Sequence, residues 1–311
     1  MRYAPLHADV ACGPDAGAAH WIKTTDHAQI RVGHWVTGAD RGTVLLFPGR
    51  TEYIEKYGRA AGDLRARGFA TITVDWRGQG LADRATPNRA TGHVAAFGDF
   101  QKDVAAMLTH ARDLGLPKPF YLIAHSMGGA IGLRALIEGL PVRAAVFSAP
   151  MWGIQMAAAL RPFAWGISSV ARRLGLDTRM APGQEAENYL TRIAVEENTL
   201  TSDPEMFDYM RRQITAYPDL GLGGPSLRWL NESLVEMRRM ARLASPRTPA
   251  TTFLGTAESI VDPGRIHDRM ARWPSGTLER VDGGKHETMM ETPDIRTRFF
   301  DTAASLFDAH R

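Results

Sequence analysis

The sequence predicts an α/β protein, with a doubly wound, mostly parallel sheet into which a helical cap is inserted. Three observations support this prediction. Apolar runs typical of buried strands alternate with helical patterns in both the first and the last part of the chain. One of these runs, which begins at Phe120, ends in a sharp turn that leads directly into a helix. Between residues 150 and 246 strand-like runs are replaced by helical patterns.

The order of the elements follows from this alternation. Runs typical of strands lie at residues 28–37, 43–47, 69–74, 144–147, 251–254 and 277–281, besides the run from Phe120. Helical patterns outside the central stretch lie at residues 53–67, 97–114, 263–272 and 294–309. Asp99 is suited to cap the second of these helices, and Asp203 followed by Pro204 is typical of a helix start. The N-terminus around Cys12 is expected to be loose. The pattern divides the chain into residues 1–149 (first part of the core), 150–246 (helical cap) and 247–311 (second part of the core).

The turn after the strand from Phe120 carries a serine at its tip. Ser126 stands between the strand and the helix, and the small residues Ala124 and Gly128 let the two elements approach closely. The amides that follow Ser126 point toward any negative charge that develops on a substrate oxygen. Ser126 is therefore a candidate nucleophile. The alternative is a buried serine in an ordinary turn of a Rossmann-like sheet.

The composition narrows the classes of protein that need consideration. The chain has 311 residues, of which 44% are hydrophobic and 23% charged, and a formal charge of +3 gives no indication of nucleic-acid binding. Its one cysteine, Cys12, excludes an internal disulfide and a cysteine-based zinc site. We expect no cofactor, since Gly78-Gln79-Gly80 lacks the third glycine of a dinucleotide-binding motif. Polar residues interrupt the N-terminus before any signal-like stretch, so a cytoplasmic protein is expected. Nothing in the sequence sets the number of subunits.

A serine nucleophile needs a base, and the base needs an acid to orient it. In a doubly wound sheet the acid and the histidine follow the serine in chain order, on loops after later strands. His286 lies on a glycine-rich loop after the last strand and is the expected base. Glu258 and Asp262 both follow the strand at 251–254 and could be the acid. Asp262 precedes Pro263 and is suited to cap the next helix, so Glu258 is favoured.

Two backbone amides should stabilise the oxyanion. One belongs to Met127, directly after the nucleophile, and the other to Arg50, in the loop that follows the strand at 43–47. Arg50 could matter through its backbone alone.

Together these motifs resemble α/β-hydrolases of the lysophospholipase and monoacylglycerol lipase type. The resemblance rests on segments 48–52, 75–80, 124–129, 255–262 and 283–286, and it covers nearly the whole chain. It implies the α/β-hydrolase fold and a serine esterase that acts on a single-chain lipid, a lysophospholipid or a monoacylglycerol. Three positions depart from the family pattern. Pro48 stands where His is usual, Ala124 replaces a glycine, and Glu258 stands where Asp is commoner.

The predicted cap is rich in methionine and large aromatic residues, which would suit an acyl-chain tunnel. These residues are Met151, Trp152, Met156, Phe163, Trp165, Met206, Phe207, Trp229, Met237 and Met240. Arginine pairs at 172–173, 211–212 and 238–239 could bring the cap into peripheral contact with an anionic membrane. A thioesterase, a peptidase acting on N-terminal proline and a non-catalytic ligand-binding descendant remain alternatives.

Overall fold

The computed structural model describes residues 1–156 and 160–311, and the side chains of this part except those of 160–164 and 170. A nine-stranded sheet runs through it in the order β1-β2-β3-β5-β4-β6-β7-β8-β9. The strands are β1 (Arg2–Ala4), β2 (Ala18–Lys23), β3 (Gln29–Trp35), β4 (Thr43–Phe47), β5 (Ala70–Asp75), β6 (Phe120–His125), β7 (Ala145–Ser148), β8 (Ala250–Gly255) and β9 (Gly276–Val281). The α-helices are α1 (Ala8–Ala11), α2 (Gly58–Arg65), α3 (Phe100–Asp113), α4 (Met127–Ile137), α5 (Leu160–Arg173), α6 (Tyr189–Arg192), α7 (Pro204–Ala216), α8 (Leu227–Arg242), α9 (Pro263–Met270) and α10 (Pro293–Asp308). Every strand and helix range expected outside the central stretch has its counterpart here.

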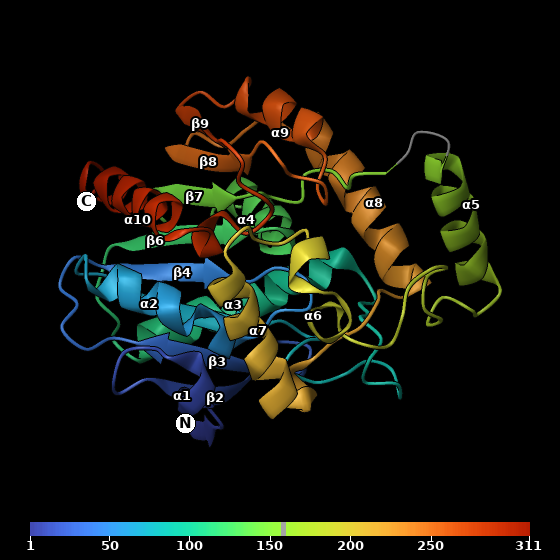
Figure 1. Cartoon of the computed structure of the whole chain (residues 1–311), viewed down its shortest axis with the longest axis horizontal. Coiled ribbons are helices and arrows are strands. Elements are labelled where there is room, and N and C mark those ends of the chain that lie inside the picture. The colour runs from blue at the N-terminus through green and yellow to red at the C-terminus, as the bar shows by residue number, and fades with distance from the viewer. Residues whose placement is uncertain (157–159) are drawn as a thin grey trace.

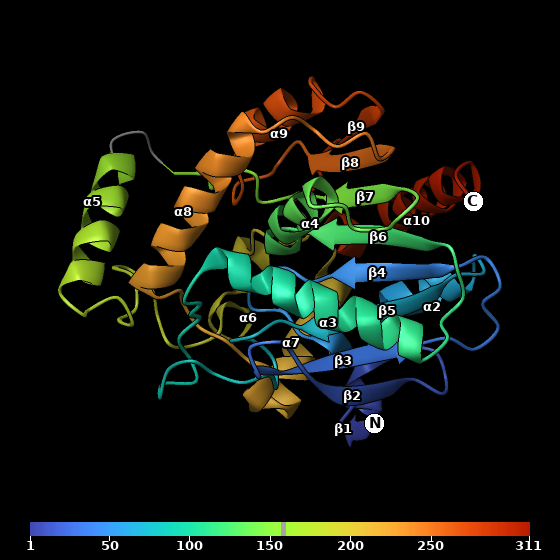
Figure 2. The same ribbon diagram turned by 180° about the vertical axis from the view of Figure 1, so that it is seen from behind.

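The sheet is mostly parallel, as predicted, and its helices cover both faces. Strands β4 to β9 pair in parallel. Helices α2 and α10 lie on one face, and α3 and α4 lie on the other (Figures 1 and 2). The apolar residues of the two layers form two buried clusters, one on each side of the sheet. The doubly wound α/β fold is therefore confirmed.

The N-terminal segment is not loose, which corrects the expectation for the chain around Cys12. Strands β1, β2 and β3 form an antiparallel extension of the sheet that ends on β5. Six residue pairs join β2 to β3, from Ala18 opposite His34 to Lys23 opposite Gln29. His20 and Lys23 obscure the apolar pattern of β2, so the strand depends on the neighbouring ladder more than on local preference.

The two expected helix caps have different outcomes. Asp203 accepts hydrogen bonds from the amides of Glu205 and Met206 and starts α7, as predicted. Asp99 precedes α3 but makes no capping hydrogen bond, and its carboxylate pairs with Lys102 at 2.8 Å instead. The helix is entered through a 3₁₀ turn (Phe97–Asp99), and the helical dihedrals of Asp99 do not place its side chain over the free amides.

The central helical stretch leaves and re-enters the sheet between two neighbouring strands. β7 ends at Ser148, β8 begins at Ala250, and the two pair in parallel. Residues 149–249, called the insertion below, contain α5, α6, α7 and α8. Figure 1 shows α5 and α8 beyond the carboxyl ends of the parallel strands. No helix in the described part of the chain is long and apolar enough to cross a membrane.

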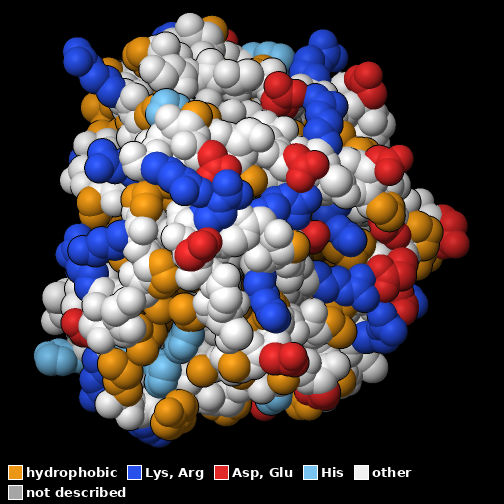
Figure 3. Space-filling view, turned by 90° about the vertical axis from the view of Figure 1, so that its left-hand side faces the viewer, with side chains coloured by type: hydrophobic (Ala, Val, Ile, Leu, Met, Phe, Trp, Pro, Cys, Tyr) orange, Lys and Arg blue, Asp and Glu red, His pale blue; other side chains and the backbone are white. Residues whose placement is uncertain are grey.

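The opposite end of the molecule carries intermixed charges. Figure 3 shows basic and acidic side chains interspersed over this face. Arg67 pairs with Asp301 at 2.7 Å and Arg41 with Asp308 at 3.0 Å. Because charges of both signs alternate here, this face does not form a single basic surface.

Three histidines meet where the antiparallel extension packs on α3. His20 Nδ1 lies 3.2 Å from His110 Nε2, and the His20 and His34 rings are 5.4 Å apart. Burial, with the nearby charges of His20 and His110, lowers the pKa of His34 to about 4. A histidine with a lowered pKa in the fold stabilises it fully above its unfolded pKa near 6.5, and this contribution is lost as the pH falls toward 4.

We expect the melting temperature of the protein to fall in acid, because His34 in the extension becomes protonated. The fall in melting temperature between pH 7 and pH 4.5 should be at least about 3 °C smaller in His34→Gln than in the parent. His267→Gln, at an exposed position on α9, is the control and should keep the parent's dependence. Differential scanning calorimetry over this range makes the comparison, and parallel curves for parent and His34→Gln would contradict the expectation.

Candidate active site

Ser126 occupies the tight turn between β6 and α4. Its backbone has φ 49° and ψ −117°, a conformation that residues other than glycine rarely adopt. Gly128 is needed here, because a Cβ at that position would lie 2.2 Å from the Phe47 carbonyl oxygen. Ala124 is accommodated because it faces Gly132, where an added Cβ would lie 3.2 Å from the Ala124 methyl. The alanine that departs from the family pattern is thus matched by Gly132, which lies one helical turn after Gly128.

Glu258 is the carboxylate that contacts His286. His286 Nδ1 lies 2.7 Å from Glu258 Oε2, and both side chains are buried. The other oxygen, Oε1, accepts hydrogen bonds from the amides of Ile260 and Val261 at 2.6 and 3.1 Å. Burial alone would raise the pKa of Glu258, but the hydrogen bond to His286 and the two amides outweigh it, and the pKa is lowered. The carboxylate is therefore held ionised and fixed in orientation beside the imidazole.

Asp262 has the position that the sequence suggested for it. It stands at the N-cap of α9 and accepts hydrogen bonds from the amides of Gly264 and Arg265 at 3.0 and 3.4 Å, with Pro263 in the first turn. The structure thus brings Glu258 to the histidine and Asp262 to the helix. Their roles in the reaction stay predictions.

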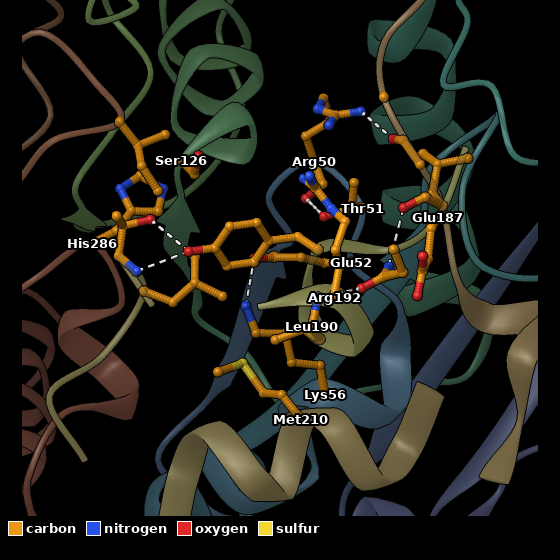
Figure 4. A pocket seen from close by; sticks show the side chains of 18 of the residues that line it. Arg50, Thr51, Glu52, Lys56, Ser126, Glu187, Leu190, Arg192, Met210 and His286 are labelled. Carbon is orange, nitrogen blue, oxygen red and sulfur yellow. Dashed lines mark hydrogen bonds and ion pairs between the residues drawn. The ribbon is translucent and has the colours of Figure 1, made fainter. Parts of the chain in front are cut away.

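Ser126 and His286 line the same cavity. The cavity has a volume of about 230 Å³, and Arg50, Lys56, Glu187 and Tyr189 are also among its lining residues. Figure 4 shows Ser126 and His286 on one side of this cavity and Arg50 and Glu187 further along it. Because Nδ1 of His286 is engaged by Glu258, Nε2 is the ring nitrogen left to receive a proton.

The two amides expected in the oxyanion hole flank the serine turn. Met127 is the first residue of α4, and Arg50 follows Gly49 in the loop after β4. Neither amide has an acceptor among the described residues. The loop is fixed by neighbouring contacts: the Gly49 amide donates to Glu52, and Trp76 Nε1 donates to the Pro48 carbonyl at 2.9 Å. Pro48, which also departs from the family pattern, makes this contact through its backbone carbonyl, so the contact does not depend on the side chain.

A buried charge cluster lies beneath Ser126 and His286. No role was predicted for it from the sequence. Lys56 Nζ lies 2.5 Å from Glu52 Oε1 and 2.5 Å from Glu287 Oε1. His125 Nε2 lies 3.4 and 3.2 Å from the same two oxygens, and its Nδ1 lies 3.0 Å from the Ser148 carbonyl oxygen. The one sequence feature that could have pointed to this cluster is that His125 directly precedes Ser126 and Glu287 directly follows His286.

Two carboxylates face a lysine and a histidine in this cluster. Burial opposes protonation of His125, but Glu287 and Glu52 outweigh it and raise the pKa of the imidazole. Glu52, His125 and Glu287 together have the composition of a metal site, but Lys56 already supplies the cation between the carboxylates. The cluster thus explains how Glu52, which holds the Gly49 amide, is itself held.

Removing the ammonium group should destabilise the fold strongly. We expect Lys56→Met to lower the free energy of unfolding by about 3 to 5 kcal/mol, because it leaves buried carboxylates without their cation. Lys102→Met is the matched control; this lysine pairs with Asp26 and Asp99 at the surface, where water screens the charges and the loss should be much smaller. Urea unfolding followed by circular dichroism measures both. Equal stability of the two variants would contradict a structural role for the cluster.

A second, apolar cavity adjoins the first at Ser126. Its volume is about 560 Å³. Its apolar lining comes mainly from the insertion and includes Met151, Ile154, Met156, Ile167, Leu227, Trp229 and Leu230. Arg50, Ser126, Gln184 and Ile260 line both cavities.

Only part of the expected acyl lining is found there. Of the methionines and aromatics singled out in the sequence, Met151, Met156 and Trp229 line the apolar cavity. Trp152, Met237 and Met240 pack in one core cluster, and Met206 and Phe207 pack in the other. Trp165 lies under the Arg238 guanidinium. The side chain of Phe163 lies outside the described ones.

Comparisons with known proteins show the family of this chain and a similar enzyme. A family model described as serine aminopeptidase, S33, matches residues 38–293. The chain is 28% identical over 280 residues to lysophospholipase L2 of Escherichia coli strain K12, which covers 86% of this chain and 80% of that protein.

Two solved structures show the same fold. A soluble variant of the monoglyceride lipase of Saccharomyces cerevisiae, in complex with a substrate analog, superposes with a TM-score of 0.70 at 21% identity and 94% coverage of each chain. The monoacylglycerol lipase of Paleococcus ferrophilus superposes with a TM-score of 0.68 at 20% identity, with 91% of this chain and 99% of that one covered.

Proposed function

This chain belongs to the serine aminopeptidase S33 family of hydrolases, and from that premise we propose that it is a serine carboxylic-ester hydrolase acting on single-acyl-chain lipids. The substrates are lysophospholipids or monoacylglycerols. Ser126 is the nucleophile, His286 the base and Glu258 the acid that orients it. The relatives named lysophospholipase and monoglyceride lipase support this choice of substrates.

The reaction follows from the order of these groups. Ser126 Oγ attacks the ester carbonyl while His286 Nε2 takes its proton, and the amides of Met127 and Arg50 stabilise the oxyanion. The tetrahedral intermediate collapses to an acyl-enzyme, and His286 gives the proton to the leaving alkoxide. Water then attacks the acyl-enzyme by the same steps in reverse and releases the fatty acid. Glu258 stays ionised and keeps the imidazole in the tautomer that can accept the proton.

The observation that carries the proposal is the pair of cavities that meet at Ser126. The apolar cavity suits an acyl chain, and the more polar one, lined by Arg50, Asn188 and Tyr189, suits the leaving alcohol. A substrate with one apolar and one polar end would thus place its ester bond beside the serine. An aminoacyl amide substrate would leave the apolar cavity without a matching group.

A substrate panel tests this proposal. The purified protein should hydrolyse long-chain lysophospholipids or monoacylglycerols with a kcat/KM at least about tenfold above that for a thioester or an N-terminal proline amide. A fluorophosphonate probe should label Ser126, as identified by mass spectrometry of the labelled peptide. Faster cleavage of the proline amide would favour the peptidase, and a chain that is neither labelled nor active would be a ligand-binding descendant.

We further propose that residues 150–246 form a cap through which the protein contacts membranes peripherally. Ile167, which lines the apolar cavity, is 46% exposed, and Leu174 and Val235 are 65% and 44% exposed. Not all the arginines considered in the sequence are free to meet lipid: Arg211 and Arg212 pair with Asp208, and Arg172 lies 3.5 Å from Glu232. The exposed apolar residues around α5 therefore support the proposal more than the arginine pairs do.

Co-sedimentation with vesicles tests the contact. The protein should pellet with phosphatidylcholine vesicles, and the double variant Ile167→Ser, Leu174→Ser should lose at least about 80% of this binding if apolar insertion drives it. Adding anionic lipid should increase binding only modestly. Unchanged binding of the double variant, or a requirement for anionic lipid, would reject this arrangement.

A further inference from the structure

Arg50 carries a charge that a backbone role in the oxyanion hole does not use. Its Nη1 donates to the Gly223 carbonyl at 3.0 Å, and its guanidinium carbon lies 5.5 Å from the centroid of the Trp229 ring. Gly92 lies on a third side, where an added Cβ would come within 3.1 Å of Nη1. The guanidinium is therefore held in place by a carbonyl and a ring.

No carboxylate pairs with Arg50 among the described residues. An arginine has five N–H donors, and the contact with Gly223 uses one of them. Burial, without a compensating anion, lowers the pKa of Arg50 to about 10. A cation that is desolvated and lacks a counterion gains strongly when an anion binds.

The Arg50 guanidinium lies where the leaving alcohol of the substrate would bind. Arg50 and Ser126 line both cavities, so the guanidinium stands where the apolar cavity passes into the polar one. An ester bond at Ser126 with its acyl chain in the apolar cavity has its glycerol on the polar side. In a lysophospholipid this glycerol carries a phosphate, whereas in a monoacylglycerol it carries a free hydroxyl.

The carboxylates of the polar cavity do not cancel this charge. Glu52 is paired with Lys56, and Glu185 is paired with Arg192 at 2.8 Å. Glu185 and Glu187 are both exposed at the rim, where water and salt screen their charge.

We propose that the Arg50 guanidinium binds the phosphate of the lipid head group and makes the enzyme prefer lysophospholipids to monoacylglycerols. This inference rests on the proposed function, since it names the substrate class of the same site. The planar guanidinium can donate two parallel hydrogen bonds to two phosphate oxygens, which a glycerol hydroxyl cannot match. In the alternative, Arg50 only fastens the core loop to the insertion, and its loss would harm all substrates equally.

The test compares two substrates with the same acyl chain. In Arg50→Met, kcat/KM for lysophosphatidylethanolamine should fall about 100-fold, which is at least about 30 times the fall for the matching monoacylglycerol, because only the phosphate uses the side-chain charge. Arg50→Lys keeps the charge and should recover at least about tenfold of the lost rate. Arg65→Met, an exposed arginine on α2, is the matched control and should leave both rates unchanged. An equal loss for both substrates, or no loss for either, would overturn the proposal.

A binding measurement separates this inference from the proposed function. Ser126→Ala protein should bind sn-glycero-3-phosphoethanolamine in titration calorimetry, and the double variant Ser126→Ala, Arg50→Met should bind it at least about tenfold more weakly. If the parent hydrolyses no lipid ester, the proposed function fails, and this titration still decides on the phosphate site. Equal binding by the two proteins, or binding by neither, would overturn it.

Discussion

Ser126→Ala is expected to abolish ester hydrolysis, with kcat reduced on the order of 10⁶-fold. The substitution removes the oxygen that forms the acyl-enzyme and leaves the rest of the turn in place. Rates with a nitrophenyl ester and with a long-chain lysophospholipid measure the loss, and fluorophosphonate labelling should disappear with it.

The control for this variant is a serine outside the site. Ser305→Ala, at an exposed position on α10, should keep activity within about twofold. Melting temperatures of both variants should lie close to that of the parent, so that loss of activity is not loss of fold. A Ser126→Ala protein that hydrolyses the nitrophenyl ester as fast as the parent would refute the mechanism.

Glu258→Ala is expected to have the second-largest effect, about 10⁴-fold in kcat. Without this carboxylate, His286 Nδ1 loses its partner at 2.7 Å, and neither its tautomer nor its orientation is held. Glu258→Asp keeps the charge on a shorter side chain, so it should retain part of the activity. Steady-state kinetics of the three proteins on one substrate measure the series.

Asp262→Ala tests which of the two candidate carboxylates, Glu258 or Asp262, is the acid. It removes the N-cap of α9 and should lower the free energy of unfolding by about 1 kcal/mol while kcat stays within about threefold of the parent. Urea unfolding and kinetics on the same preparations give both values. The reverse pattern, with activity lost in Asp262→Ala and kept in Glu258→Ala, would reassign the acid.

Much of the fold could be predicted from local pattern. The buried parallel strands β4 to β8 are short runs rich in apolar and β-branched residues and bounded by turn residues, which together indicate strands. Glu258 could be preferred over Asp262 because Asp-Pro at a helix start is a recognisable cap. In each case the information lies within a few consecutive residues.

What could not be predicted depends on contacts between distant segments. Strands β1 and β2 exist through the ladders that join β1 to β2 and β2 to β3. The ion pair of Lys56 with Glu287 joins residues 231 positions apart. Similarly, the sequence gives no sign that the Arg50 side chain reaches Gly223. A single sequence records such residues only as ordinary polar positions.

The adjacency of β7 and β8 has a consequence for how relatives of this chain can differ. Because the strands on either side of the insertion pair directly, the chain leaves the sheet and re-enters it at neighbouring strands. The length and lining of the insertion can therefore drift while the hydrogen bonds of the sheet stay unbroken. Substrate range can then change through substitutions in the insertion. The residues proposed to carry out the reaction, which lie on the sheet domain, can stay the same.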